Sequence, residues 1–422
     1  MRILIINFNR EFANALEKKT FNAFSGYMEV DYYGPGYSTT HELNNGLKAY
    51  IGSRNPYDAL IMPISFLISC LDEKSIRYMY NLHRDYLSSF SVICASRYSR
   101  RILDDFLDIT NEVKMIFTGD IDTVKMRDSV HHMLKKLLDC GFYVLGVGHE
   151  LTPIVDENRD IKFFGGFPLT NHNYNLAREY YHRWISLPST AATDDELFFG
   201  NLENRSYDWV VPGSLESSYP ERMRVLSLLK KSGYRIWDNF TDRALYQKIS
   251  RKARWKYTNY NNSRDRILNT ILNSSKMYIP NNVKREEIAR YRESYQECLR
   301  ASKCAYADGG TAKCIVLKYF EIPAKGTVML GDYVCGLDKL GFTPGVHMIE
   351  ASSENIIEES KKIFADPDKM QQVASNGRKL VIEKHTYRQR ALDFKNALTT
   401  IKNGKFFGSR WEAGEFIIEP KV

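Results

Sequence analysis

The segment from Lys318 to Asp332, KYFEIPAKGTVMLGD, combines charged side chains with the signals of a short helix and a following strand. Glu321 lies at the start of the expected helix, which runs into Gly326 and then an apolar strand. Ligands of open α/β folds bind at the carboxyl edge of the sheet, where a carboxylate can accept hydrogen bonds from both hydroxyls of a ribose. Lys318 lies one helical turn before Glu321 and, with the helix dipole, can bind a phosphate.

A second candidate site lies where YDWVVPGS, beginning at Tyr207, is followed by SYPER, ending at Arg222. Gly213 permits close backbone approach at the end of an expected strand. Ser214 offers a hydroxyl and an N–H, and Arg222 can make a two-pronged phosphate contact. These groups together suit a pyrophosphate. The GxGxxG fingerprint is absent, so a plain dinucleotide-binding dehydrogenase is less favoured.

The elements that must position these residues alternate between short β-branched runs and longer amphipathic segments, which indicates βαβ units around parallel sheets. In the first half the expected strands are Ile3–Asn7, Glu29–Tyr33, Ala59–Ile64, Ser91–Ala95, Met115–Phe117 and Tyr143–Val147. Val130–Cys140 has the spacing of a helix with one buried face, and Gly141 is its expected C-cap. The first half is therefore predicted to be Rossmann-like.

The same α/β rhythm returns in the second half. Strands are expected at Trp209–Val211, Arg235–Trp237, Met277–Pro280, Cys304–Ala307 and Val328–Gly331. Helices are expected at Pro220–Ser232, Arg264–Asn273, Glu286–Ala301, Val316–Lys325, Glu354–Ala365, Pro367–Glu383 and Tyr387–Lys402. With 422 residues the chain is long enough for two domains. The aperiodic stretch after Leu187 divides them, so we predict domains at residues 1–200 and 201–400.

Composition narrows the class of protein. Hydrophobic residues at 43% and charged residues at 26% are typical of a folded globular protein, and a net charge of +8 suits an anionic ligand. Seven cysteines without a CxxC pair favour a reducing, cytoplasmic location. We expect no signal peptide and no transmembrane helix, because the apolar stretch Ala59–Cys70 is too short to cross a bilayer. No clustered His, Cys and Asp spacing predicts a metal site.

The motifs resemble those of GT-B glycosyltransferases, and within them the group related to the spore-maturation protein CgeB. The matching segments are, in order, KYFEIPAKG, TVMLGD, KLGFTPG and FADPDKMQQVASNGRKLVIEKHTYRQR, and the resemblance covers Trp209 to about Leu398. It implies a GT-B fold, in which two Rossmann-like domains face each other across a cleft. By analogy with that fold, the tail at residues 401–422, with Trp411, is expected to cross back to the N-terminal domain.

The resemblance also implies roles for residues of both halves. The expected donor is a UDP-sugar, which acts as a co-substrate, and no cofactor or metal is expected. Glu321 would bind its ribose and Lys318 its diphosphate. The full set of donor-binding residues would be Gly213, Ser214, Arg222, Lys318, Glu321 and Gly326. The acceptor side would include Arg10, Tyr33, Gly34, Gly36 and Tyr37, although residues 32–37 also suit a packed turn. His149 and Glu150 are the candidates for a catalytic base, with a structural role as the alternative for His149. His385 of the HTYRQR segment is expected to pack the final helices.

The basic run from Arg243 to Tyr260, RALYQKISRKARWKYTNY, mixes cations with aromatic rings. This composition suits a surface that binds the phosphates and bases of nucleic acid, while a solvated helix face is the simpler alternative. If the run binds polyanion, the acceptor could be a modified DNA base flipped out of the stack. An anionic membrane face or a glycan are the other surfaces it could meet.

The sequence thus predicts a metal-independent glycosyltransferase, transferring a hexosyl or pentosyl group to an acceptor hydroxyl on a glycan or a DNA base. Whether the sugar is transferred with retention or inversion stays open. Two alternatives belong to other classes of protein: a non-catalytic GT-B-like protein that binds nucleotide or polyanion, and a sugar-nucleotide epimerase on the same fold.

Overall fold

The computed structural model describes residues 1–7, 15–34, 37–71, 89–110, 112–119, 128–156, 170–193, 200–213, 215, 219–237 and 294–421. The basic run Arg243–Tyr260 and the expected elements Arg264–Asn273 and Met277–Pro280 lie outside these residues, as does most of Glu286–Ala301.

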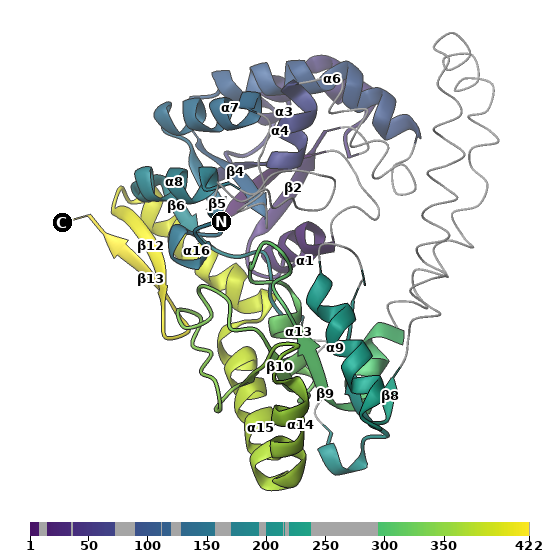
Figure 1. Cartoon of the computed structure of the whole chain (residues 1–422). Helices are drawn as coiled ribbons and strands as arrows, with labels where there is room; N and C mark the ends of the chain where they lie inside the picture. The colour runs from purple at the N-terminus through teal and green to yellow at the C-terminus, as the bar shows by residue number, and fades with distance from the viewer. Residues whose placement is uncertain are drawn as a thin grey trace.

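A six-stranded parallel sheet forms the first half of the chain (Figure 1). Its strands are β1 (Arg2–Ile6), β2 (Glu29–Tyr33), β3 (Ala59–Pro63), β4 (Val113–Gly119), β5 (Tyr143–Gly146) and β6 (Trp184–Ser186), in the order β2-β1-β3-β4-β5-β6. Alternate residues of β1 enter two different buried clusters: Ile3 and Ile5 one, Leu4 and Ile6 the other. Both faces of the sheet are therefore covered, which explains why its strands read as continuous apolar runs.

The helices of the first half are α1 (Ala15–Phe24), α2 (Thr40–Asn45), α3 (Leu47–Gly52), α4 (Ile64–Leu71), α6 (Ser89–Asp108), α7 (Asp128–Asp139) and α8 (His172–Glu179). The expected strand at Ser91–Ala95 is wrong, because these residues lie inside α6. A short apolar run can be a buried strand or part of a helix, and the residues that follow decide between them. Tyr98, Ile102 and Phe106 are buried at helical spacing, so the run extends a 20-residue helix.

A five-stranded parallel sheet forms the second half. Its strands are β7 (Tyr207–Val210), β8 (Ile236–Trp237), β9 (Ser302–Ala307), β10 (Val328–Gly331) and β11 (Ile349–Glu350), in the order β11-β10-β9-β7-β8. The labelled helices are α9 (Pro220–Lys231), α13 (Lys318–Ala324), α14 (Ile356–Ala365), α15 (Pro367–Lys384) and α16 (Tyr387–Lys402). Two parallel α/β sheets confirm the predicted fold class.

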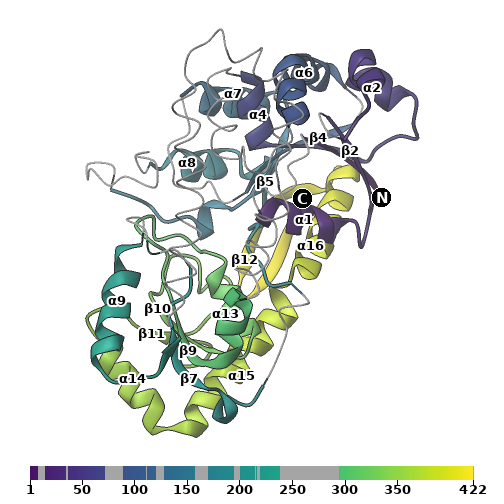
Figure 2. The same ribbon diagram turned by 90° about the vertical axis from the view of Figure 1, so that its right-hand side faces the viewer.

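The chain crosses between the halves twice, and the two crossings are hydrogen-bonded to each other. The N–H of Ala192 donates to the carbonyl of His385 at 2.9 Å, and the N–H of Tyr387 donates to the carbonyl of Ala192 at 2.9 Å. Beyond this junction α16 packs on α1, with the rings of Phe24 and Phe394 stacked 4.5 Å apart (Figure 2). Helix α1 is therefore held by an element that follows the second sheet.

The chain ends in a hairpin of β12 (Phe406–Glu412) and β13 (Glu415–Pro420), which lies against β6 of the first sheet (Figure 1). The hydroxyl of Ser409 accepts from the Ser186 N–H at 2.8 Å, and the indole N–H of Trp411 donates to the Ser186 carbonyl at 2.7 Å. The C-terminal residues thus contact the first half through a strand edge.

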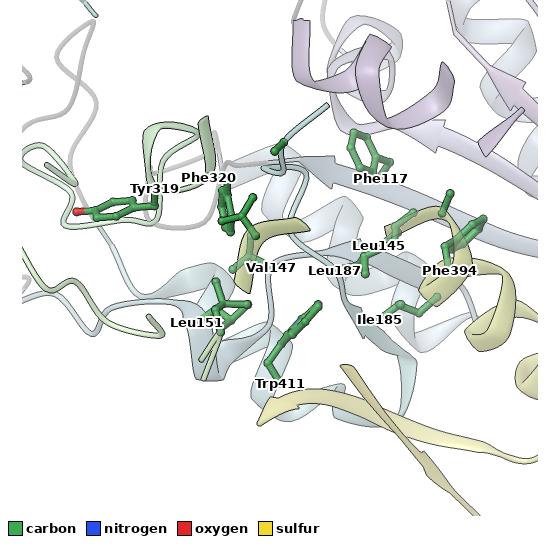
Figure 3. Close-up of a cluster of buried hydrophobic side chains, with 14 of the residues drawn as sticks. Phe117, Leu145, Val147, Leu151, Ile185, Leu187, Tyr319, Phe320, Phe394 and Trp411 are labelled. Atoms are coloured by element: carbon green, nitrogen blue, oxygen red, sulfur yellow. The ribbon is translucent and has the colours of Figure 1, made fainter. Parts of the chain in front are cut away.

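One buried apolar cluster runs through both halves (Figure 3). Val147 and Leu151, which follow the carboxyl end of β5, lie in it together with Phe320 of α13 and Trp411 of β12. A Cβ added at Gly336, in the loop after β10, would lie 2.7 Å from Leu151 Cα. Loops from the carboxyl ends of the two sheets therefore meet, and the two edges face each other.

His385 lies in this shared region and is fully buried. Burial and the Arg390 charge hold the pKa of His385 well below its usual range, so the ring is neutral at pH 7. Its Nε2–H donates to the Leu340 carbonyl at 2.7 Å, and its Nδ1 accepts from Arg390 at 2.9 Å. The predicted packing role of His385 is confirmed.

Among the described residues, no helix is long and apolar enough to span a membrane.

Candidate functional site

Three separate segments converge at the carboxyl edge of the second sheet. Gly213 follows β7 in the left-handed region, at φ +91°. A Cβ built on it would lie 2.4 Å from Lys318 Cε, 2.6 Å from Lys318 Nζ and 3.0 Å from Arg222 Nη1. Only glycine suits both the backbone conformation and the close approach. The structure therefore brings together three of the predicted donor-site residues, from β7, α9 and α13.

Arg222 is fully buried behind this point. Its Nε donates to Asp308 Oδ1 at 2.6 Å, and its guanidinium lies 3.6 Å from the centre of the Tyr219 ring. Burial raises the pKa of Asp308 although the Arg222 charge opposes this, because removing the carboxylate from water is the larger effect. Arg222 is thus a buried support of the site, whereas the Lys318 side chain is partly exposed to solvent.

Two aspartates that sequence reasoning did not select lie at the same edge. Asp308 comes directly after β9, and Asp332 directly after β10. The Asp332 carboxylate accepts from the Gly309 N–H at 3.0 Å and from the Tyr319 hydroxyl at 2.7 Å, and Lys313 Nζ lies 2.7 Å from it. An aspartate directly after an expected strand was the available signal, since such residues collect at one sheet edge. The Asp332 carboxylate therefore links the loop after β9 to Tyr319, which follows Lys318 on α13.

Glu321 lies one turn after Lys318 on α13 and is buried. The Tyr295 hydroxyl donates to its Oε2 at 2.8 Å, and Lys19 Nζ of α1 lies 3.9 Å from its Oε1. Sequence reasoning missed both partners. Tyr295 belongs to the helical residues 294–301, which precede β9, and Lys19 is 302 positions away in the chain, so no local pattern connects them with Glu321.

Gly326 lies away from this group. It ends α13 at φ +62°, just before the first residue of β10, and its N–H donates to the Pro323 carbonyl at 2.7 Å. The amino end of a strand is the edge opposite to the one that carries Lys318. Gly326 therefore makes the turn that starts β10 and is not among the residues brought together. Ser214 lies outside the described residues.

The predicted acceptor-side residues that the structure describes lie at the end of β2 and just after it. Tyr33 is fully buried, and a Cβ added at Gly34, which has φ +134°, would lie 2.1 Å from the carbonyl oxygen of Asn7. Tyr37 is 39% exposed and stacks on Tyr32, with ring centres 4.7 Å apart. Of the described members of the predicted set, Tyr37 therefore has the largest exposed fraction. Arg10 and Gly36 lie outside the described residues.

His149 and Glu150 form a one-turn helix after β5. The Ser186 hydroxyl donates to Glu150 Oε1, and His149 Nδ1 lies 3.7 Å from Glu150 Oε2. Burial raises the pKa of Glu150. The His149 ring lies edge-on to Tyr174 and Tyr181, which come from the same half. The pair therefore lies at the carboxyl edge of the first sheet.

The chemistry of the converged group is that of an anion and diol site. Lys318 carries a positive charge, the backbone of Gly213 allows close approach, and Glu321 has a carboxylate one helical turn away. Lys318 and Gly213 suit a phosphate, and the Glu321 carboxylate suits two adjacent hydroxyls. Within the part of the chain that the structure describes, no group of three or more His, Cys, Asp and Glu side chains could hold a metal ion.

Comparisons with known proteins agree with this architecture. Residues 240–396 match the model of a family described as "Glycosyl transferase-like". No curated protein matches the chain in sequence. A glycosyltransferase from Rickettsia africae is similar in structure at 9% identity, with a TM-score of 0.50 over 95% of this chain and 98% of that one.

Two further structures score slightly lower. Anabaena HepE, solved with UDP and glucose, has a TM-score of 0.49 at 8% identity, over 95% of this chain and all of that one. A sucrose-phosphate synthase from Thermosynechococcus elongatus has a TM-score of 0.49 at 12% identity, over 96% of this chain and all of that one. The two parallel α/β sheets and the likeness to the Rickettsia africae protein show the GT-B fold, and residues 240–396 are similar in sequence to the glycosyl transferase-like family.

Proposed function

We propose that this protein is a glycosyltransferase that takes a sugar from a nucleoside diphosphate sugar, a UDP-sugar in the first instance, and transfers it to an acceptor hydroxyl. The observation that carries the proposal is the convergence of Gly213, Lys318 and Arg222 at one sheet edge, with Glu321 one helical turn away. The family match over residues 240–396 supports the same reaction class.

In this proposal Lys318 and the Gly213 backbone bind the diphosphate, and Glu321 accepts hydrogen bonds from the ribose hydroxyls. As the bond from the sugar to the diphosphate breaks, negative charge grows on the leaving oxygen. In this proposal Lys318 and the Gly213 N–H lie beside that oxygen and stabilise the charge without a metal ion. Arg222 is paired with Asp308, and this buried ion pair supports the position of Lys318.

The acceptor is proposed to bind along the carboxyl edge of the first sheet, which carries Tyr37 after β2 and the His149 and Glu150 pair after β5, with its reacting hydroxyl at that pair as the base. The Glu150 carboxylate lies close enough to stabilise a protonated His149 ring. A glycan and a modified DNA base are both acceptors of the proposed kind. DNA is included because of the basic run Arg243–Tyr260, which lies outside the described residues.

The test is a thermal-shift panel of uridine, guanosine and other nucleoside diphosphate sugars on the full chain. At about 100 times Kd, a ligand that binds only the folded state adds about 2.7 kcal/mol of stability. We expect one donor to raise Tm and Glu321→Gln to reduce the shift. Glu297→Gln, at an exposed position of the helical residues 294–301, is the matched control and should keep it.

Product analysis then separates the reaction classes. A transferase slowly hydrolyses its donor to free sugar and nucleoside diphosphate when no acceptor is present. An epimerase returns an intact nucleotide sugar with one inverted carbon, and a binding protein leaves the donor unchanged. Stabilisation by none of the nucleotides, or a shift that is unchanged in Glu321→Gln, contradicts the proposed donor site.

A further inference from the structure

The first half reaches Glu321 through Lys19. Its Nζ lies 3.9 Å from Glu321 Oε1, and its side chain is 28% exposed while that of Glu321 is 6% exposed. The Lys19 ammonium also lies 5.8 Å from the centre of the Tyr387 ring. The lysine thus lies between a buried carboxylate of α13 and an aromatic ring of α16.

The packing of α1 fixes this lysine relative to the second half. Phe24, on the same helix, stacks on Phe394 of α16, and both rings are buried in the cluster shared by the two halves. Lys19 lies five positions before Phe24, so the helix holds its ammonium close to a well-anchored point. Helix α1 lies in the first half of the chain, and it also packs against α16, which follows the second sheet.

The two oxygens of Glu321 have different surroundings. Oε2 accepts a 2.8 Å hydrogen bond from Tyr295. Oε1 faces Lys19 at 3.9 Å, which is beyond hydrogen-bond reach but close enough for strong attraction where water is scarce. A buried carboxylate needs a positive neighbour to remain charged. A charged oxygen accepts hydrogen bonds about twice as strong as a neutral one.

We propose that Lys19 is a positioning residue for the ribose of the donor. Lys19 keeps the Glu321 carboxylate charged, and Tyr295 sets its orientation, so that Oε1 can accept from a ribose hydroxyl. The proposal rests on the proposed function, and it adds that the ribose subsite is completed by the first half of the chain. Preference for ribose over deoxyribose is therefore a property of both halves.

The test measures dissociation constants of uridine diphosphate and guanosine diphosphate, each beside its 2′-deoxy and 3′-deoxy counterparts, by calorimetry on the full chain. We expect Lys19→Met to reduce the ribose preference by about tenfold, the size of one hydrogen bond to a charged group. Lys19→Arg keeps the charge and should keep most of the preference. Lys18→Met, at an exposed position of the same helix, should leave it unchanged.

A double-mutant cycle links the lysine to its carboxylate. Glu321→Gln should itself remove the ribose preference, and adding Lys19→Met should then reduce it no further. Equal weakening of ribose and deoxyribose nucleotides by Lys19→Met overturns the inference, because it indicates a general charge effect. An unchanged preference in Lys19→Met overturns it as well.

These outcomes are distinct from failure of the proposed function. If the unmodified protein binds none of the nucleotides, the donor site itself is wrong, and the Lys19 role falls with it. If the protein binds nucleotides, and Glu321→Gln abolishes ribose preference while Lys19→Met does not, the donor site stands and only the role of Lys19 is lost. Unfolding curves of each variant show whether a change in binding reflects loss of the fold.

Discussion

The carboxyl edges of the two sheets have the same architecture but different side chains. The second sheet carries Asp308 and Asp332 directly after neighbouring strands, each paired with a cation. The first sheet carries a closed turn at Tyr33 and Gly34, and a carboxylate, Glu150, bound by Ser186 of a neighbouring strand. Parallel sheets provide an edge where ligands can bind, but the charges placed there decide what binds.

The largest expected effect comes from breaking the buried pair of the second edge. Arg222→Met leaves the Asp308 carboxylate buried without its partner, so we expect a loss of about 3–5 kcal/mol in the free energy of unfolding. Arg224→Met, on the same helix, breaks an exposed pair and should cost less than about 1 kcal/mol. Urea denaturation of both variants measures the difference. Equal losses would contradict the distinction between a buried framework and a solvated surface.

A second prediction separates backbone strain from ligand binding. Gly213→Ala places a methyl group where Lys318 lies, so it should displace the ammonium and raise the Kd for nucleoside diphosphate by about tenfold. Gly233→Ala has similar strain, at φ +79°, but its Cβ would enter open space. Both variants should lose about 1–2 kcal/mol of stability. Only Gly213→Ala should lose affinity, and equal affinities would count against Gly213 as part of the site.

The smallest effect is expected at the first edge and depends on pH. Burial raises the pKa of Glu150, so its ionisation costs stability in the folded state but not in the unfolded one. The cost is absent below the unfolded pKa, near 4.5, and grows as pH rises through the raised folded value. Glu150→Gln removes it, so the stability of the variant relative to the unmodified protein should rise from pH 4 to pH 8.

Activity of the same variant tests whether Glu150 takes part in the reaction. If Glu150 serves with His149 as the base, Glu150→Gln should become more stable at pH 8 and yet lose turnover. Retained turnover with raised stability would assign the pair to structure alone. Tm measured across the pH range, beside kcat for the donor identified in the panel, distinguishes these results.

Local sequence patterns predicted most of the described helices and strands, because each of these elements has its own period of buried residues. Helix α16 begins and ends at the predicted residues Tyr387 and Lys402. Periodicity failed at Ser91–Ala95, where a five-residue apolar run belongs to a much longer helix. The pairing of Gly213 with Lys318 rested on the family resemblance, since the 104 residues between them carry no signal of contact.

The sequence by itself determined two parallel α/β halves and the residue types of an anion and diol site, since strand and helix periods and motif spacing are local properties. Only the tertiary structure decided that Arg222 is buried against Asp308, that Gly326 lies at the opposite edge from Lys318, and that Lys19 meets Glu321. These contacts join distant segments, and they depend on how α1, α13 and α16 pack around one shared core. Packing of that kind follows from the summed shape of many side chains, which no single motif encodes.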